Sequence, residues 1–101
     1  MVTDQELQAF CEHVTAKRNA YYDAQGFANS TREPHAFQRG PKYARIVCVE
    51  DGKPSSVFCF VDLANGNILK AASWKTPAKH PRGNIANGSA DVTPYGAQYL
   101  R

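Results

Sequence analysis

Apolar side chains recur every three or four residues near the start of the chain, the spacing of one face of an α-helix. The apolar positions are Leu7, Phe10, Cys11, Val14 and Tyr21, with Arg18 at the same spacing, and Leu7, Phe10, Val14 and Tyr21 form a single stripe. The segment Thr3-Asp4-Gln5-Glu6 just before them matches a capping box, which satisfies free N–H groups at a helix start. The pattern predicts a helix that begins at this box, ends near Ala24 and is stopped by Gly26.

Further along, short runs of β-branched and aromatic residues alternate with turn residues. Residues 43–49 and 56–61 have strand length and composition, and Asp51-Gly52 between them suits a tight hairpin turn. Asn65-Gly66 offers a second tight turn, for which we expect type I′ geometry, before a third run at residues 67–72. The pattern predicts a three-stranded antiparallel meander.

Three other segments lack this regularity. The stretch from Phe27 to Pro41 reads as a long connection, with Phe27, His35 and Phe37 as candidates to fix it to the core. Pro77 and Pro81 exclude a regular central strand after Trp74, so we expect the following basic segment to leave the sheet as a loop or short helical turn. Residues 93–100 begin with Thr-Pro and predict a short final helix, which Gly96 weakens.

These elements together predict an α+β fold with one domain over residues 1–101. The N-terminal helix is expected to pack on one face of the meander, with the irregular basic C-terminal segment along an edge or across the open face. One helix leaves the other sheet face uncovered, so we expect either that segment or a second subunit to cover it. A homodimer is therefore one possible assembly.

The charge of the chain is unevenly distributed. Residues 1–62 hold seven Lys and Arg against eight Asp and Glu, whereas residues 63–101 hold five against one. The net charge of +3 thus comes from the C-terminal third, and no acidic residue lies between Asp62 and Asp91. This asymmetry indicates an anionic partner.

The middle of that acid-free segment combines cations with the single tryptophan of the chain. Long cations suit a phosphate backbone, and an aromatic face suits base stacking. The same pattern also fits a tryptophan packed in the core with ordinary solvated lysines beside it. Arg82-Gly83-Asn84 could wrap a phosphate or simply form a turn. The candidate binding residues are Lys70, Trp74, Lys75, Lys79, His80, Arg82 and Asn84.

Catalytic and metal-binding patterns are weak. His13, His35 and His80 are scattered, and no cluster of His, Cys, Asp or Glu has metal-ligand spacing, so no metal or cofactor is expected. Ser73 or Cys59 could be combined with His80 and Asp62, yet no nucleophile motif surrounds them. The three cysteines are odd in number and widely spaced, as expected of buried thiols. We therefore expect a non-catalytic protein.

Targeting signals are also weak in this sequence. No apolar run approaches the roughly 20 residues that span a bilayer, so no membrane association is expected. The first residues lack the basic start and apolar core of a signal peptide. The sequence favours a cytoplasmic location.

The run Lys70-Ala-Ala-Ser-Trp74-Lys75, continued by Pro77-Ala-Lys79-His80 and by Arg82-Gly-Asn-Ile85, resembles a family of small uncharacterised proteins of tailed bacteriophages. The resemblance covers roughly the last sixty residues, including the closing Tyr95–Arg101, and Pro81 departs from the family, which usually has a small residue there. It implies a phage accessory protein acting in the bacterial cytoplasm. It implies no activity.

Three functions remain open from the sequence. The first is non-catalytic nucleic-acid binding through the basic Trp74 segment, without specific base readout. The second is inhibition of a host enzyme or defence protein, with the same segment docked in an acidic or nucleic-acid-binding cleft and Trp74 and Arg82 as anchors. The third is a small nucleotide-binding or ligand-binding module with the phosphate at Arg82-Gly83-Asn84.

Overall fold

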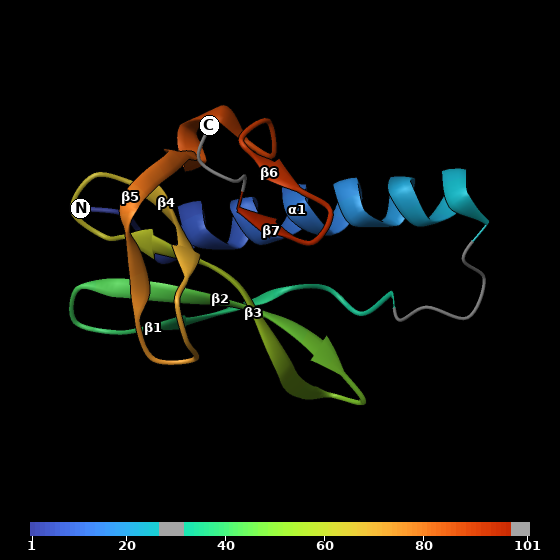
Figure 1. Cartoon of the computed structure of the whole chain (residues 1–101), viewed down its shortest axis with the longest axis horizontal. Coiled ribbons are helices and arrows are strands. Elements are labelled where there is room, and N and C mark those ends of the chain that lie inside the picture. The colour runs from blue at the N-terminus through green and yellow to red at the C-terminus, as the bar shows by residue number, and fades with distance from the viewer. Residues whose placement is uncertain (27–31, 98–101) are drawn as a thin grey trace.

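The fold is one long helix packed on one face of a five-stranded antiparallel sheet (Figure 1). The structure, a computed structural model, describes residues 1–26 and 32–97. The strands of the main sheet lie side by side in chain order, and a two-stranded hairpin follows them. The elements are α1 (Asp4–Gln25), β1 (Ala36–Arg39), β2 (Tyr43–Glu50), β3 (Lys53–Asp62), β4 (Asn67–Ala71), β5 (Pro77–Asn84), the 3₁₀ turn η1 (Ile85–Asn87), β6 (Val92–Thr93) and β7 (Gly96–Ala97).

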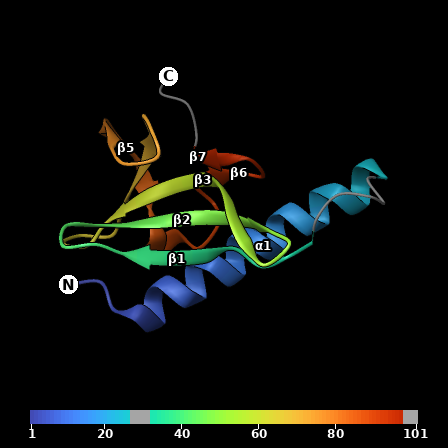
Figure 2. The same ribbon diagram turned by 90° about the horizontal axis from the view of Figure 1, so that it is seen from below.

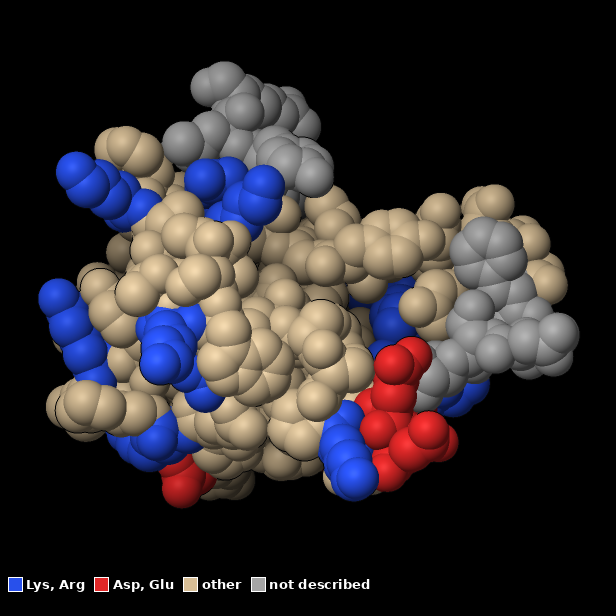
Figure 3. Space-filling model, turned by 60° about the horizontal axis from the view of Figure 1, so that its bottom comes forward, with Lys and Arg blue, Asp and Glu red and all other residues tan. Residues whose placement is uncertain are grey.

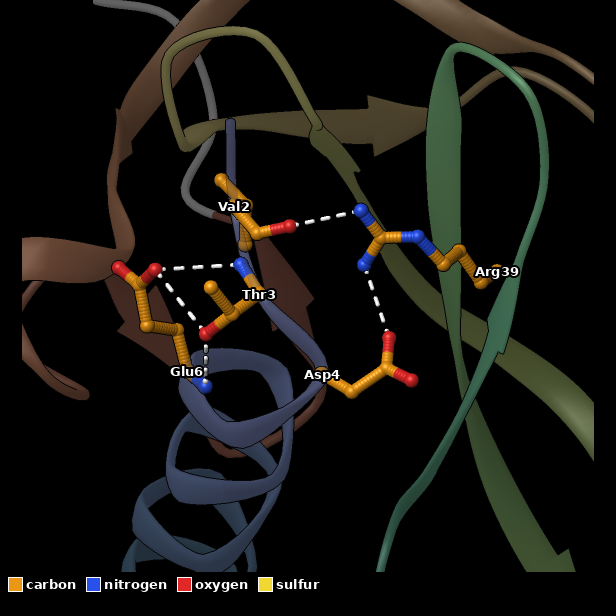
Figure 4. A network of polar contacts seen from close by, with 5 residues as sticks. All are labelled: Val2, Thr3, Asp4, Glu6 and Arg39. Carbon is orange, nitrogen blue, oxygen red and sulfur yellow. Dashed lines mark hydrogen bonds and ion pairs between the residues drawn. The ribbon is translucent and has the colours of Figure 1, made fainter.

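The predicted capping box forms and fixes the start of α1 (Figure 4). The backbone N–H of Glu6 donates to the Thr3 hydroxyl at 3.1 Å, and the Thr3 N–H donates to the Glu6 carboxylate at 3.1 Å. Arg39 of β1 donates to the Asp4 carboxylate at 2.8 Å and to the Val2 carbonyl at 2.7 Å. Arg39 therefore ties the start of the helix and the residue before its cap to the sheet. Gly26 ends the helix in the left-handed conformation at φ 72°.

The core lies between α1 and the sheet. Leu7, Phe10 and Val14 are fully buried as predicted, whereas Tyr21 is only half-buried. In Figure 2 α1 passes behind β1 to β3, and its C-terminal end extends beyond the strands in both ribbon views. Among the described residues, no helix combines the length and apolar character needed to cross a membrane. The sheet contributes Ala44, Ile46, Phe58, Cys59, Val61 and Ile68 to this core.

The turn between β2 and β3 has the predicted geometry. Asp51 and Gly52 have φ values of 53° and 75°, and positive φ at both central residues is the signature of a type I′ hairpin turn. The turn at Asn65-Gly66 differs from our prediction, because only Gly66 has a positive φ, at 80°. Four residues separate β3 from β4, and the Gly66 N–H donates to the Asp62 carbonyl at 2.7 Å. Because this loop is longer than a two-residue type I′ turn, Asn65 does not have to adopt the left-handed conformation.

The three-stranded sheet predicted from the sequence is too small, because two further strands flank it. β1 lies inside the segment that we read as a connection, and it pairs with β2 over four residues. Its sequence is too short to show an alternating pattern. The strand exists because β2 offers it a partner, with Phe37 packed against the core. Phe27, the other proposed anchor of this segment, lies outside the described residues.

The second unpredicted strand, β5, contains most of the basic segment. The prediction that this segment leaves the sheet is wrong, although the exclusion of a central strand is consistent with its position at the edge. Pro77 opens β5, and Pro81 lies opposite Leu69 of β4. A proline has no backbone N–H to donate to a neighbouring strand, and an edge strand tolerates this because it has a neighbour on one side only. Irregular register on either side of Leu69 accommodates both prolines.

The predicted final helix is wrong over residues 93–97, and its last residues lie outside the described part of the chain. Val92–Thr93 and Gly96–Ala97 form an antiparallel hairpin instead. The Thr93 hydroxyl accepts from the Tyr95 N–H at 3.1 Å and donates to the Gly96 carbonyl at 3.1 Å. A Cβ on Gly96 would lie 2.7 Å from the Phe58 carbonyl oxygen, so the glycine allows β7 to approach β3 closely.

His35 joins the chain before β1 to the helix. Its backbone N–H donates to the Thr15 hydroxyl at 2.9 Å, and its Nδ1 lies 2.9 Å from the same oxygen. The ring packs edge-on against Phe58, and its Nε2 has no hydrogen-bond partner in the described part of the chain. Burial, and secondarily the nearby Arg18 guanidinium, lower the pKa of His35 to about 4. The imidazole is therefore neutral in the folded protein at neutral pH.

We expect Gly83→Ala to destabilise the protein more than Gly52→Ala does. A Cβ on Gly83 would lie 2.2 Å from the Cβ of Asp91, whereas a Cβ on Gly52 meets nothing within 4 Å. Overpacking adds about 1–3 kcal/mol at the first position, while the second incurs backbone strain alone. Urea unfolding of both variants measures the difference. Equal losses of unfolding free energy in the two variants would show that β5 and the loop that carries Asp91 can move apart without destabilising the fold.

The buried His35 predicts a loss of stability in mild acid. In the unfolded chain His35 binds a proton as the pH falls below its ordinary pKa of 6.5. In the folded chain it binds that proton only near pH 4. The free energy of unfolding should therefore fall across this interval, by at most about 1.4 kcal/mol per pH unit. Unfolding of wild type, His35→Gln and the exposed-site control His80→Gln between pH 7 and pH 5 measures the effect. The dependence should shrink in His35→Gln alone, and a parallel decline in all three would rule His35 out as its source.

Candidate nucleic-acid interface

The turn between β4 and β5 presents Trp74 and Lys75 at its tip. The N–H groups of Ala72 and Ser73 both donate to the Thr76 carbonyl, at 3.0 and 3.1 Å. The Ser73 hydroxyl lies 2.8 Å from the Thr76 hydroxyl and accepts from the Thr76 N–H at 3.2 Å. This internal network holds the turn in one shape without using the side chains of Trp74 or Lys75.

Trp74 lies against the sheet face that α1 leaves open, and Arg45 from the middle of β2 holds it there. The Arg45 guanidinium stacks over the Trp74 ring at 5.1 Å and donates from Nε to the Trp74 carbonyl at 2.7 Å. It also lies over the Phe60 ring at 5.8 Å and donates to the Gln38 side-chain oxygen at 2.7 Å. Trp74 keeps 42% of its surface exposed, so it is neither a core residue nor a free one.

A shallow depression of about 320 Å³ lies beside this stack. Arg39, Lys42, Arg45 and Lys75 line it together with Tyr43 and Phe60. Arg39 forms an ion pair with Asp4, whereas the hydrogen bonds of Arg45 go to neutral oxygens and no acidic residue in the described part of the chain forms an ion pair with it. Figure 3 shows most of the visible Lys and Arg side chains spread over the left half of the view, with one acidic side chain among them, while the other visible acidic side chains gather right of centre beside a further basic one. We call this the cationic depression.

A second depression, of about 580 Å³, adjoins the first and shares Tyr43 with it. Its polar lining comes from Asp62, Asn65, Asn67 and Thr76 and from Lys79 of β5. Leu69, Pro77 and Pro81 complete it on the apolar side. We call this the amide depression. Its described lining has one acidic and one basic residue, whereas all the charged residues that line the cationic depression are basic.

The structure separates the residues that the sequence placed in one site. Trp74, Lys75 and Lys79 lie along the open face. Lys70 instead lines a pocket on the helix side of the sheet, with Phe58 and Ala97. Neighbouring residues of a strand point to opposite faces, so Leu69 and Lys70 divide between the two. Lys70 thus shares the face of the buried Ile68, whereas the turn that follows β4 places Trp74 and Lys75 on the opposite face.

The last three predicted residues, at the end of β5, have different surroundings. His80 is exposed and its carbonyl accepts from Arg82 Nε at 3.1 Å. Arg82 is half-buried at an irregularity, where Ile68 and Leu69 of β4 face Gly83 and Pro81. Asn84 is structural, because its side chain donates to the Asn65 carbonyl at 2.9 Å and caps η1 by accepting from the Ala86 N–H at 2.9 Å.

Asp91 closes the same region from the other side. Its carboxylate accepts from the Asn84 N–H at 3.1 Å and from the Asn87 side chain at 2.7 Å. These hydrogen bonds, that of Asn87 first, lower the pKa of Asp91 below its ordinary value. The carboxylate packs directly on Gly83. A phosphate at Arg82-Gly83-Asn84 would therefore meet a negative charge, which disfavours the third function suggested by the sequence.

Sequence reasoning missed the half of the interface that comes from β1 and β2. Tyr43 and Arg45 were read only as part of a strand, and Lys42 lies between that strand and the connection predicted before it. One signal was available, because Arg45 alternates with the buried residues Ala44 and Ile46 and so had to lie on the open face. Which cations of the basic segment it would meet depends on pairing through β3 and β4, and the sequence does not show that register.

Removal of the Arg45 side chain should release Trp74. Arg45→Ala removes a charged hydrogen bond and a cation–π contact, together about 1–2 kcal/mol. Trp74 is the only tryptophan, so its emission should shift to longer wavelength and acrylamide should quench it more strongly. Lys42→Ala, which removes the same charge from the same face, serves as the control. Identical fluorescence in wild type and Arg45→Ala would show that the turn alone holds Trp74.

Comparison with known proteins adds a family but no activity. A family model described as a family of unknown function (DUF7717) matches residues 2–93. The matched region runs from the residue before the capping box through β6 and includes both depressions. No curated protein and no solved structure matches the chain significantly. The α+β protein described here, with its open cationic sheet face, belongs to this family of unknown function.

Proposed function

We propose that this chain is a non-catalytic nucleic-acid-binding protein that uses the open face of its sheet. The observation that carries the proposal is the half-exposed Trp74 ring, held by Arg45 at the rim of the cationic depression. The interface consists of Trp74, Lys75 and Lys79 from the sequence prediction, with Lys42, Tyr43 and Arg45 added from β2 and its approach. The bacteriophage resemblance is compatible with such an accessory role in a host cytoplasm.

The physical case rests on charge and on aromatic surface. Lysine and arginine side chains release counterions when they neutralise phosphates, and this gain supplies most non-specific affinity. Exposed aromatic rings add sequence-tolerant stacking with bases, about 1–3 kcal/mol each. Antiparallel sheets with exposed aromatic residues bind nucleic acids in this way in several folds. The open face combines both features on one rigid surface.

A host protein is the competing partner. Tryptophan and arginine are the residue types that dominate protein–protein hot spots, and here they are stacked on each other at an exposed surface. An inhibitor that docks this face into an acidic cleft would use the same residues. Stoichiometric capture of one host protein after nuclease treatment, in the absence of any oligonucleotide binding, would favour that function over ours.

Salt dependence tests the proposed function directly. Fluorescence anisotropy with labelled oligonucleotides should show affinity that falls steeply between about 50 and 200 mM salt. Lys75→Ala and Lys79→Ala should each weaken binding at all sequences and reduce the salt slope by about one phosphate contact. Lys53→Ala is the matched control, because it removes the same charge at the β2–β3 turn, at the other end of the sheet (Figure 1).

Two results would overturn the proposal. One is affinity that does not change with salt. The other is a loss in Lys53→Ala as large as in the two open-face variants, which would show that net charge matters and the face does not.

A further inference from the structure

The two depressions of the open face differ in chemistry although they share a wall. The cationic depression has Arg39, Lys42, Arg45 and Lys75 in its lining, and no acidic residue of the described ranges 1–26 and 32–97 lines it. The amide depression has Asp62 and Lys79, whose charges offset each other, with Asn65 and Asn67 between them. A phosphate is favoured in the first. A neutral ring with hydrogen-bonding edges is favoured in the second.

Tyr43 stands between the two. It lines both depressions, and its ring packs edge-on against Phe60 at 6.4 Å between centroids. The Lys42 ammonium lies over the Tyr43 ring at 5.3 Å. The ring is half-buried and is held by the sheet below it, so it offers a fixed aromatic surface at the point where a phosphate site meets a polar site.

The amide depression is also pre-organised. Asn84 donates to the Asn65 carbonyl at 2.9 Å and to the Asn67 side-chain oxygen at 3.1 Å. The Asn67 N–H donates to the Asn65 side-chain oxygen at 2.9 Å, and one Asp62 carboxylate oxygen accepts from the Ala64 N–H at 2.9 Å. One side-chain oxygen of each of Asp62, Asn65 and Asn67 is thus held by a hydrogen bond, and all three residues line the depression. Such fixed donors and acceptors suit a base edge.

From this arrangement we infer that the open face takes single-stranded nucleic acid, with a phosphate in the cationic depression and an unpaired base beside Tyr43 in the amide depression. This inference rests on the proposed function and specifies its substrate class. A paired base in a duplex keeps its Watson–Crick edge occupied and its faces stacked. Only an unstacked base reaches side chains at the floor of a depression, so a duplex gains the phosphate contacts alone.

The experiment compares strands and variants on the full chain. Anisotropy is measured with a short single-stranded oligonucleotide, as DNA and as RNA, with the duplex of the same sequence, and with a single strand that carries abasic sites. Wild type should bind the single strand about tenfold more tightly than the duplex or the abasic strand, within the range of one stacked base. Comparison of the DNA and RNA arms identifies which strand the face prefers.

The variants locate the base. Tyr43→Leu should lose about tenfold in affinity for the single strand and leave duplex affinity and the salt slope unchanged. Tyr43→Phe keeps the ring and should retain single-strand affinity, which separates stacking from folding. Lys75→Ala should weaken binding to all strands alike, because it acts on phosphate.

The outcomes separate the two proposals. Duplex binding as tight as single-strand binding, or equal losses for both strands in Tyr43→Leu, overturns the single-strand inference and leaves the nucleic-acid function standing. Binding of the abasic strand as tight as that of the intact single strand would also overturn the single-strand inference alone. Absence of salt-dependent binding to every strand overturns both.

Discussion

A single helix has to cover a sheet of five strands, and this mismatch shapes the molecule. α1 buries its apolar stripe against one face, and its last turns extend beyond the strands (Figures 1 and 2). The opposite face therefore depends on its own side chains for cover. Phe60 and Leu69 are nearly buried there because the β4–β5 turn folds over and Arg45 fills the space beneath Trp74. The stack that shields this face is also what makes it cationic and aromatic.

The contacts that cover this face also hold Arg45 in place in the candidate site. Arg45 is anchored by Gln38 on one side and by the Trp74 carbonyl on the other, so its charge has a fixed position. Side chains that are already ordered lose little conformational entropy when a partner binds. A surface built from flexible lysines alone would carry charge, but the charges would have no fixed positions. Here the aromatic rings and the guanidinium define where a phosphate and a base would lie.

The sequence predicted those parts of the structure that depend on a few neighbouring residues. The capping box at Thr3 and the Asp51-Gly52 turn specify their structures within a few residues, and both were confirmed. β1 is stable only through β2, and β5 accepts Pro81 only because no strand lies beyond it among the described residues. Both strands therefore depend on how the sheet is assembled, which the local sequence does not show. The candidate site follows the same division, because Trp74 and Lys75 were found from their own segment whereas Arg45 meets them across 29 residues of chain.

The two prolines of β5 have a consequence for aggregation. An exposed edge strand is a template on which another chain can add its own strand, and long flat edges lead to fibrous assembly. Pro77 and Pro81 carry no N–H to donate, and the pairing of β5 with β4 is irregular on either side of Leu69. Further strands are therefore disfavoured on the side of the sheet that carries Lys79 and His80. A basic strand can thus remain exposed in a crowded cell without acting as a seed for polymerisation.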